Sequence, residues 1–338
     1  MSRTRANIAA ITTLRAIERD RRPADADEQS VLARWSGWGA VPEVFDAQRE
    51  QFAWARSHLG ELLSEDELAA AARNTLNAHY TDAELVKTIW SAASKLGFHA
   101  GQVLEPGCGS GNFIGFAPEG ARMLGVELEP ITAAIARALY PDAQILNSSF
   151  AELRLREGTF DLVVGNVPFG KVELHDRRHN PGRHNIHNHF LIKSLWLTRP
   201  GGLVLLLTSR YTLDAQNPAA RREMAALADL VGAVRLPGGA HQRAAGTSVV
   251  TDLLVLRRRE DGRTPAGAEW EVARPLDLTG GRWRSTSTST ITPARCSGTC
   301  PSATACTRTS CSSVVTVQSH RPWRRRSIGW SMRPAATA

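Results

Sequence analysis

Short apolar segments alternate with helical patterns from Gly101 onward, and this alternation limits the possible folds more than any other property of the chain. The segments are Val103-Leu104, Met123 to Val126, Ile145-Leu146, Phe160 to Val164, Leu203 to Leu207 and Leu253 to Leu256. Strands alternating with helices predict a doubly wound α/β fold with a parallel sheet. Ligands of such sheets bind beyond the carboxyl ends of the strands.

The first 76 residues have the patterns of helices instead. Asn7 is a favourable N-cap for a helix whose apolar positions recur at threes: Ile8, Ile11, Leu14 and Ile17. A second helix over 28–34 leads into a glycine-broken aromatic loop, Trp35-Ser36-Gly37-Trp38-Gly39. Capping boxes at Ser64-x-x-Glu67 and Thr81-x-x-Glu84 predict two further helix starts.

The excess positive charge of the chain, +8 in total, lies in its last 57 residues. From Arg282 onward there are nine arginines, no lysine and no acidic residue, whereas residues 1–281 carry 32 basic and 33 acidic side chains. The basic composition therefore says nothing about the partner of the folded part. A single cysteine before this tail, Cys108, fits a reducing cytoplasm. The chain shows no secretory signal and no apolar run of the ~18 residues that a membrane span needs.

The tail, residues 282–338, does not resemble a folded domain, and residues 261–281 are expected to form a linker. The tail contains 21 Ser or Thr and has no helical period, so disorder is expected. A zinc site is an alternative, but Cys296, Cys300, Cys306 and Cys311 lack a C-x2-C pair. A third interpretation is that the chain after about Gly281 is read in a shifted frame, which the coding DNA would show.

The predicted first strand ends in a glycine-rich turn, Glu105-Pro106-Gly107-Cys108-Gly109-Ser110-Gly111-Asn112-Phe113. Alternate glycines let a ligand approach the backbone just before a helix N-terminus. Glu127 ends the next strand, 20 residues after Gly107, where a carboxylate can accept both hydroxyls of a ribose. A dinucleotide fingerprint would need glycine in place of Asn112 or Ile114, and no phosphate-loop lysine follows. The predicted ligand is therefore S-adenosylmethionine, which carries adenosine without a pyrophosphate.

The predicted fourth strand runs directly into Asn166-Val167-Pro168-Phe169. The exocyclic amine of adenine is a poor nucleophile, so a transferase must hold both its hydrogens while the lone pair turns toward a methyl group. The Asn166 side-chain oxygen and the Val167 carbonyl are candidates for the two acceptors, and Phe169 can stack on the base. An ordinary strand-to-loop turn is the alternative, because Asn and Pro are common in turns.

Taken together, these motifs resemble the N6-adenine-specific DNA methyltransferases. Their order is Asn77-Ala78-His79-Tyr80-Thr81, the glycine-rich turn, Gly125-Val126-Glu127 and Asn166-Val167-Pro168-Phe169. More narrowly, the chain is similar over about residues 5 to 280 to the methylase-like domain of large helicase/methylase proteins of phages and mobile elements. The resemblance implies a Rossmann-like S-adenosylmethionine-dependent methyltransferase sheet over 77–260, preceded by a helical region over 1–76.

The resemblance also implies roles for individual residues. Tyr80 and Thr81 line the methionine end of the cofactor, and Glu127 binds its ribose. The remaining cofactor-binding residues are Glu105, Pro106, Gly107, Gly109, Gly111, Asn112, Phe113, Ser149 and Phe150. The catalytic pocket for the target base consists of Asn166, Val167, Pro168 and Phe169.

Two positions depart from the family pattern. Val167 stands where many members have proline, which is tolerable because the contact uses a backbone carbonyl. Ser149-Phe150 stands where the third strand often ends in Asp-Phe, whose acid contacts the adenine amine of the cofactor. A serine can accept one hydrogen bond there, so weaker cofactor binding is expected.

Half of the histidines of the chain follow the base pocket, at positions 175, 179, 184, 187 and 189. Their spacing has no regular ligand geometry and the neighbouring arginines repel a cation, so a metal site is disfavoured. We expect a solvated loop that contacts DNA phosphates through Lys171, Arg177, Arg178 and Arg183.

The leading hypothesis is methyl transfer from S-adenosylmethionine to the N6 amine of adenine in DNA, by a cytoplasmic protein without membrane contact. Its expected partners are DNA and a helicase region or a helicase protein encoded downstream. Two alternatives stay open: methylation of a protein glutamine amide, and a non-catalytic DNA-binding or scaffolding remnant of a longer helicase-methylase protein. Labelled cofactor with DNA or protein acceptors separates the first two, and a failure to bind the cofactor indicates the third.

Overall fold

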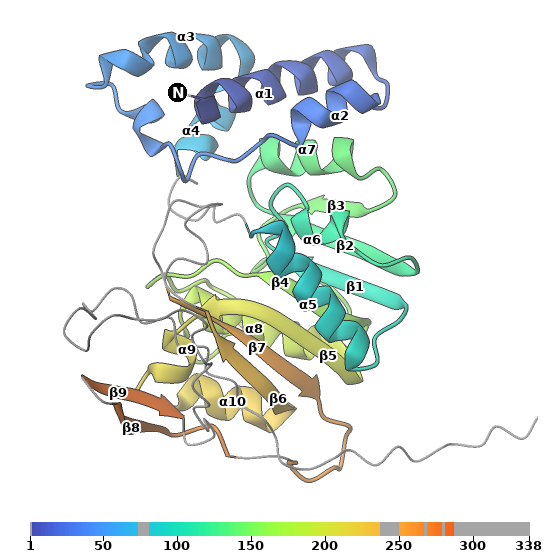
Figure 1. Ribbon diagram of the computed structural model, residues 1–338, viewed down its shortest axis with the longest axis vertical. Coiled ribbons are helices and arrows are strands. Elements are labelled where there is room, and N and C mark those ends of the chain that lie inside the picture. Colours follow the sequence, from blue (N-terminus) through green and yellow to red (C-terminus); the bar gives the residue numbers. More distant parts are fainter. Residues whose placement is uncertain (1, 74–80, 237–249, 267–268, 279–280, 287–338) are drawn as a thin grey trace, which may run out of the picture.

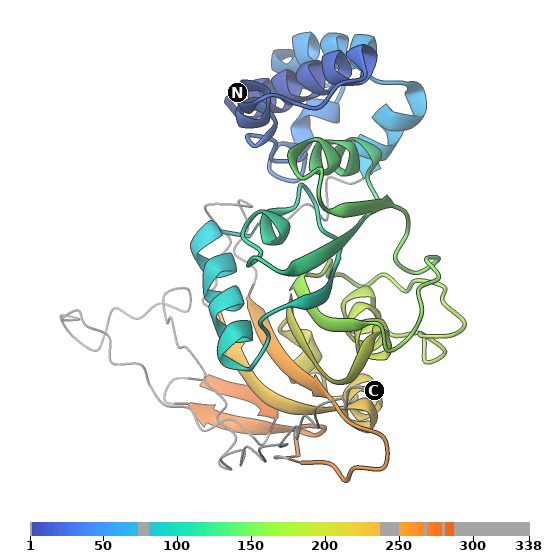
Figure 2. The ribbon, with the colours of Figure 1, turned by 90° about the vertical axis from the view of Figure 1, so that its right-hand side faces the viewer.

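The computed structural model describes residues 2–73, 81–236, 250–266, 269–278 and 281–286. The N-terminal region is helical, as its apolar periodicity predicts, and lies at one end of the molecule (Figures 1 and 2). Its elements are α1 (Ser2–Asp20), α2 (Ala26–Leu32), η1 (Pro42–Phe45), η2 (Glu50–Phe52), α3 (Ala53–Leu62) and α4 (Glu65–Arg73). None of the described helices is both long and apolar enough to cross a membrane.

A seven-stranded sheet forms the centre of the molecule, in the order β3-β2-β1-β4-β5-β7-β6. Its strands are β1 (Gly101–Pro106), β2 (Ala121–Glu127), β3 (Gln144–Asn147), β4 (Phe160–Asn166), β5 (Thr198–Ser209), β6 (Ala228–Arg235) and β7 (Thr251–Arg258). The α/β fold is confirmed, but β7 pairs antiparallel with both β5 and β6, so the prediction of a wholly parallel sheet is wrong. An apolar run such as Leu253 to Leu256 indicates a buried strand but not its direction.

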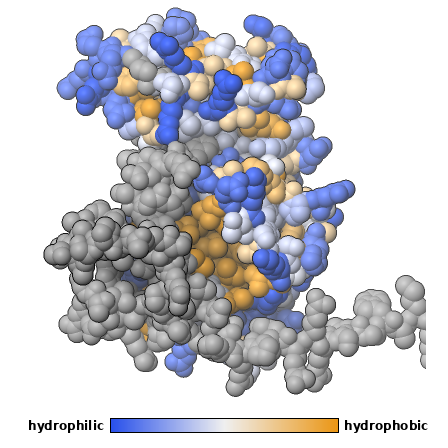
Figure 3. Space-filling model, viewed as in Figure 1, coloured by the Kyte–Doolittle hydropathy of each residue, from blue (hydrophilic) through white to orange (hydrophobic). Residues whose placement is uncertain are grey.

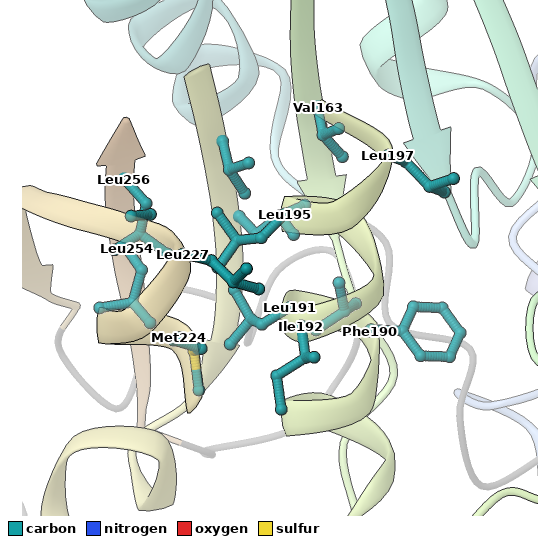
Figure 4. Packing of buried hydrophobic residues seen from close by; sticks show 14 of the residues in the cluster. Val163, Phe190, Leu191, Ile192, Leu195, Leu197, Met224, Leu227, Leu254 and Leu256 are labelled. Atoms are coloured by element: carbon teal, nitrogen blue, oxygen red, sulfur yellow. The ribbon is translucent and has the colours of Figure 1, made fainter. Parts of the chain in front are cut away.

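Helices cover both faces of the sheet, because successive side chains of a strand point to opposite faces. Leu162 of β4 belongs to the same buried cluster as Val86 of α5 (Ala83–Lys95). The next residue, Val163, belongs to the cluster of Leu191 of α8 (Ile186–Leu197) and Met224 of α10 (Ala219–Leu227) (Figure 4). The helices of this part are α5 (Ala83–Lys95), α6 (Asn112–Gly115), α7 (Pro130–Leu139), α8 (Ile186–Leu197), α9 (Tyr211–Asp214) and α10 (Ala219–Leu227).

The N-terminal helices pack against α7, which follows β2 (Figures 1 and 2). Ile131 and Ile135 of α7 belong to one buried cluster with Ile11 and Leu14 of α1. On the face seen in Figure 3, the helical region shows hydrophilic residues with apolar residues between them. The helical region and the sheet are therefore joined by a common apolar core.

The first helix begins at Ser2, so the prediction that Asn7 caps it is wrong. Asn7 lies buried within α1, where its Nδ2 donates a hydrogen bond to the Gly37 carbonyl at 2.6 Å. Its Oδ1 accepts a hydrogen bond from the Ser36 amide at 3.0 Å. The capping residue type was recognised, but its side chain bonds to a distant loop rather than to its own helix.

The two predicted capping boxes have different outcomes. The box at Ser64 and Glu67 is confirmed: the Ser64 amide donates to Glu67 Oε2 at 2.9 Å, and the Glu67 amide donates to Ser64 Oγ at 3.3 Å. Thr81 does not cap α5, because the neighbouring Asp82 accepts the hydrogen bond from the Glu84 amide. The Thr81 hydroxyl is therefore available for other contacts.

Two further strands, β8 (Ala273–Leu278) and β9 (Gly281–Thr286), form a separate antiparallel pair. They lie where we predicted a linker over 261–281 and the start of a disordered tail, so both predictions are wrong over these strands. Composition averaged over the tail does not detect strands held by hydrogen bonds to a neighbouring segment. The rest of the tail, including its four cysteines, lies outside the described residues.

Candidate active site

A cavity of about 180 Å³ lies at the carboxyl ends of β1, β2 and β4. The predicted site residues that line it are Thr81, Glu105, Gly107, Gly109, Asn112, Phe113, Glu127, Ser149, Phe150, Asn166, Val167 and Pro168. Pro106, Gly111 and Phe169 do not line it, although each adjoins a residue that does. Tyr80 lies outside the described residues. The predicted cofactor residues and the predicted base pocket thus share one space.

The glycine-rich turn after β1 forms one wall of this cavity. The amides of Gly107 and Cys108 both donate to the carbonyl of Val126, at 2.8 and 2.9 Å, which fastens the turn to β2. Gly109 has a φ of +56°, a left-handed conformation that favours glycine. A Cβ atom at Gly109 would meet no described atom within 4 Å, so a ligand has room against the backbone there.

Glu105, near the end of β1, is buried beneath the turn. It accepts hydrogen bonds from the amides of Phe113 and Ile114 at the start of α6. Burial, followed by the nearby Glu127 charge, raises the pKa of Glu105 well above its ordinary value. Its Oε2 atom has no hydrogen-bond partner among the described residues. A buried polar atom of this kind is costly unless a ligand donates to it.

Glu127 ends β2 and is held by two backbone amides. Gly109 donates to its Oε2 at 2.9 Å, and Glu129 donates to its Oε1 at 2.8 Å. Burial raises the pKa of Glu127 to about 7. Each oxygen keeps a lone pair beyond these bonds, so the fixed carboxyl group can accept further hydrogen bonds from a ligand.

The acidic side chains of the cavity favour a cationic ligand, because a positive charge beside them stabilises their ionised forms. Glu105, Glu127 and Glu129 are buried in its wall, and none of the described lining residues is Lys, Arg or His. Opposite charges attract strongly where water is excluded, and like charges repel. The residues therefore fit S-adenosylmethionine, whose sulfonium and ammonium groups are positive, and do not fit the pyrophosphate of a dinucleotide.

Asn166 ends β4 and contacts the opposite side of the cavity through Thr81. Its Nδ2 donates to Thr81 Oγ1 at 3.2 Å, and Nδ2 of Asn112 donates to the Thr81 carbonyl at 3.0 Å. The Val167 amide donates to the Leu207 carbonyl of β5 at 3.1 Å, which holds the turn after β4. Thr81 thus joins the glycine-rich turn to the predicted base pocket.

The loop after β3 brings Ser149 and Phe150 to the cavity. The Phe150 ring packs against Phe190 of α8, with ring centroids 4.7 Å apart. Behind it lies the buried Lys193, whose Nζ is 5.1 Å from the Phe150 ring centroid. The same Nζ donates to the carbonyl of Ala151 at 3.1 Å, so a cation of α8 holds the loop in place.

The histidine-rich segment is not the solvated loop that we predicted. His179, His187 and His189 are buried. Oδ2 of the buried Asp176 accepts a hydrogen bond from Lys193 Nζ at 2.9 Å and lies 3.2 Å from His189 Nε2. Burial alone would raise the pKa of Asp176, but hydrogen bonds from Lys193 and other donors outweigh it and hold the pKa below its ordinary value. The sequence pattern does not distinguish a solvated histidine from one that packs around a buried acid.

The four predicted DNA-binding cations lie on the surface, outside the cavity. Lys171, Arg177, Arg178 and Arg183 are all exposed. Arg178 pairs with Glu157 at 2.7 Å, and Arg183 pairs with Glu173 at 3.3 Å. In the described part of the chain, no group of three or more His, Cys, Asp or Glu side chains is arranged to hold a metal ion.

Several residues of the cavity wall were not predicted from the sequence, Glu129 and Thr132 at the start of α7 among them. Gly37 and Trp38 come from the N-terminal helical region, and Leu174, Ile186 and Phe190 come from the segment after the base pocket. The aromatic loop at 35–39 was the available signal, because glycines between large aromatic residues indicate backbone held close to another part of the fold.

Residues 104–177 match a protein family described as a methyltransferase domain. The matched segment includes the glycine-rich turn, Glu127 and Asn166. Fold, site and family match agree: residues 104–177 are similar to a methyltransferase domain, the sheet is Rossmann-like, and the cofactor indicated is S-adenosylmethionine.

Among curated proteins, the chain is similar to "Defense against restriction protein B" of Escherichia phage P1, with 28% identity over 189 residues. The match covers 54% of this chain and 8% of the phage protein, so the chain spans a small part of that protein's length. A solved Listeria monocytogenes protein described as a class I S-adenosylmethionine-dependent methyltransferase is 15% identical, with a TM-score of 0.46 over 78% of this chain and 90% of that chain. The type I restriction-modification methyltransferase subunit of Streptococcus thermophilus is 16% identical, with a TM-score of 0.44 over 63% and 55%.

Proposed function

We propose that this domain transfers a methyl group from S-adenosylmethionine to the N6 amine of adenine in DNA. The observation that carries the proposal is that Asn166 and Glu127 line the same cavity, together with the glycine-rich turn. The same cavity then offers the Glu127 carboxyl group to a ribose and the Asn166 amide to an exocyclic amine. Catalysis of group transfer depends on holding donor and acceptor in this way.

S-adenosylmethionine supplies an electrophilic methyl group on a positive sulfonium, so the protein needs no strong base before the transfer. The side chains of this domain bind the methyl donor and the acceptor and orient them toward each other. In the proposal, the Asn166 amide oxygen and the Val167 carbonyl accept the two hydrogens of the adenine amine, which turns its lone pair toward the methyl group. The hydrogen bond from Asn166 Nδ2 to Thr81 Oγ1, at 3.2 Å, fixes the direction of the amide.

The target adenine has to leave the base stack before it can reach this cavity. Pro168 lines the cavity, and the half-buried Phe169 follows it, where an aromatic ring can stack on an extruded base. Leu174 and Ile186 add apolar surface to the same wall. These residues support a pocket for a flat, neutral ring.

Contacts with the DNA backbone are proposed for Lys171, Arg177, Arg178 and Arg183. All four are exposed and follow the base pocket in the chain. Their contact with phosphate would position the duplex without reading its sequence.

The name of the phage relative, which refers to defence against restriction, supports DNA as the acceptor. A helicase region or protein as a partner stays a proposal, as does a cytoplasmic location.

The experiment offers plasmid DNA and labelled S-adenosylmethionine to the full chain and identifies the methylated nucleoside chromatographically. We expect N6-methyladenine, and we expect Asn166→Ala to lower its formation by about 100-fold, because the acceptor amine loses its alignment. Cofactor affinity of the variant, measured by calorimetry, should stay within about threefold of the wild type.

Asn217→Ala is the matched control, since Asn217 is exposed and does not line the cavity. It should methylate DNA at the wild-type rate. Label on a protein glutamine and not on DNA would reject adenine as the acceptor. No transfer to DNA or protein would reject methyl transfer, and a failure to bind the cofactor as well would favour the scaffold alternative.

A further inference from the structure

The aromatic loop Trp35–Trp38 belongs to the N-terminal helical region, yet it reaches the cofactor cavity. Gly37 and Trp38 line this cavity together with Glu127 and Glu129. The segment matched by the methyltransferase family starts only at residue 104. The helical region therefore adds a wall that the sheet alone does not provide.

Asn7 of α1 holds the loop in place through hydrogen bonds to its backbone. Asn7 Nδ2 donates to the Gly37 carbonyl at 2.6 Å, and its Oδ1 accepts from the amide of Ser36 at 3.0 Å and from its hydroxyl at 3.1 Å. Asn7 is completely buried, so these bonds are shielded from water. The backbone of the loop is thus fixed at the residue that enters the cavity.

The loop is also joined to the ribose side of the cavity by a chain of hydrogen bonds. Trp35 Nε1 donates to Thr132 Oγ1 at 3.1 Å, and this hydroxyl donates to Glu129 Oε2 at 2.6 Å. The Glu129 amide in turn donates to Glu127 Oε1 at 2.8 Å. Trp38, three residues after Trp35, packs edge to face on it with ring centroids 5.6 Å apart.

We propose that Trp38 is a cofactor-binding residue that packs against the adenosine part of S-adenosylmethionine, and that Asn7 and Trp35 position it. An indole ring offers a large flat apolar surface to a nucleoside. In the described part of the chain its Nε1–H makes no hydrogen bond, so it can also donate one to the ligand. The inference rests on the methyl donor and not on the acceptor, so it can hold even if adenine in DNA is not the substrate.

The test measures binding of S-adenosylmethionine to the full chain by calorimetry, without any acceptor. We expect Trp38→Ala to raise the Kd at least tenfold, equivalent to about 1.4 kcal/mol. Trp54→Ala is the matched control: Trp54 lies in the same helical region, packs on His58 with centroids 5.9 Å apart and does not line the cavity. Its Kd should stay within twofold of the wild type. A folded Trp38→Ala protein with an unchanged Kd would overturn the proposal.

A conservative variant covers the case in which Trp38→Ala does not fold. Trp38→Phe keeps an aromatic ring in the core, and its folding is checked by far-ultraviolet circular dichroism. Cofactor binding should change the tryptophan fluorescence of the wild type and of Trp54→Phe, whereas Trp38→Phe should lose most of that change. An equal fluorescence change in all three proteins would refute contact between Trp38 and the cofactor.

Discussion

Glu127 combines its proposed ligand-binding role with a cost to stability. Two backbone amides, from Gly109 and Glu129, fix its carboxyl group, but burial raises its pKa from 4.5 to about 7. Between these pH values the unfolded chain releases a proton that the folded protein keeps, so stability falls as the pH rises. A cationic ligand would offset this cost when it binds beside the ionised group.

Replacing Glu127 with Gln should therefore flatten part of the pH dependence of stability. The full pKa change corresponds to roughly 3 kcal/mol. As the pH rises from 5 to 8, the free energy of unfolding of Glu127→Gln should therefore increase relative to that of the wild type by up to this amount. Urea unfolding of the cofactor-free proteins at several pH values measures the difference. The exposed Glu119 serves as the control, with Glu119→Gln following the wild type. Parallel profiles for Glu127→Gln and the wild type would contradict the prediction.

The glycine-rich turn lies directly on β2, and the absence of a side chain at Gly125 makes this possible. A Cβ atom at Gly125 would lie 2.8 Å from Cys108 Sγ in the turn and 2.9 Å from Ile145 Cδ1 of β3. Both distances are shorter than atoms in contact allow. The position of the glycine-rich turn thus depends on a strand residue that does not itself line the cavity.

Gly125→Ala should destabilise the protein by about 1–3 kcal/mol through overpacking. It should also weaken S-adenosylmethionine binding, because the clash displaces the turn. Gly60→Ala is the contrasting variant: Gly60 is exposed within α3 and a Cβ there meets nothing within 4 Å. Since alanine favours helix, that change should stabilise by roughly 0.5–1 kcal/mol. Urea unfolding measures both, and a neutral Gly125→Ala would show that the turn can shift without cost.

The helical region and the methyltransferase sheet are joined through α7. Ile135 of α7 is fully buried among side chains of α1 and of the aromatic loop, while Trp35 bonds to Thr132 of the same helix. Apolar burial across such a junction couples the stability of both parts. We expect them to unfold together rather than as two independent units.

Ile135→Ala should lower the free energy of unfolding by about 2–5 kcal/mol, because it leaves a cavity at this junction. Circular dichroism and tryptophan fluorescence should report one coincident transition in urea for both the variant and the wild type. Val172→Ala, at an exposed position, should change stability by less than about 0.5 kcal/mol. Two separate transitions in the wild type would disprove the coupling.

Local sequence was sufficient for six strands of the seven-stranded sheet and for most of the cavity. Gly107, Glu127 and Asn166 each lie at the carboxyl end of a strand, and parallel strands bring such ends to one edge of a sheet. Long-range packing was needed for the rest: the direction of β7, the burial of His189 around Asp176, and the entry of Trp38 into the cavity. The physical reason is that these features depend on contacts between distant residues, such as the hydrogen bond from Trp35 to Thr132, and no pattern within a few positions encodes such a contact.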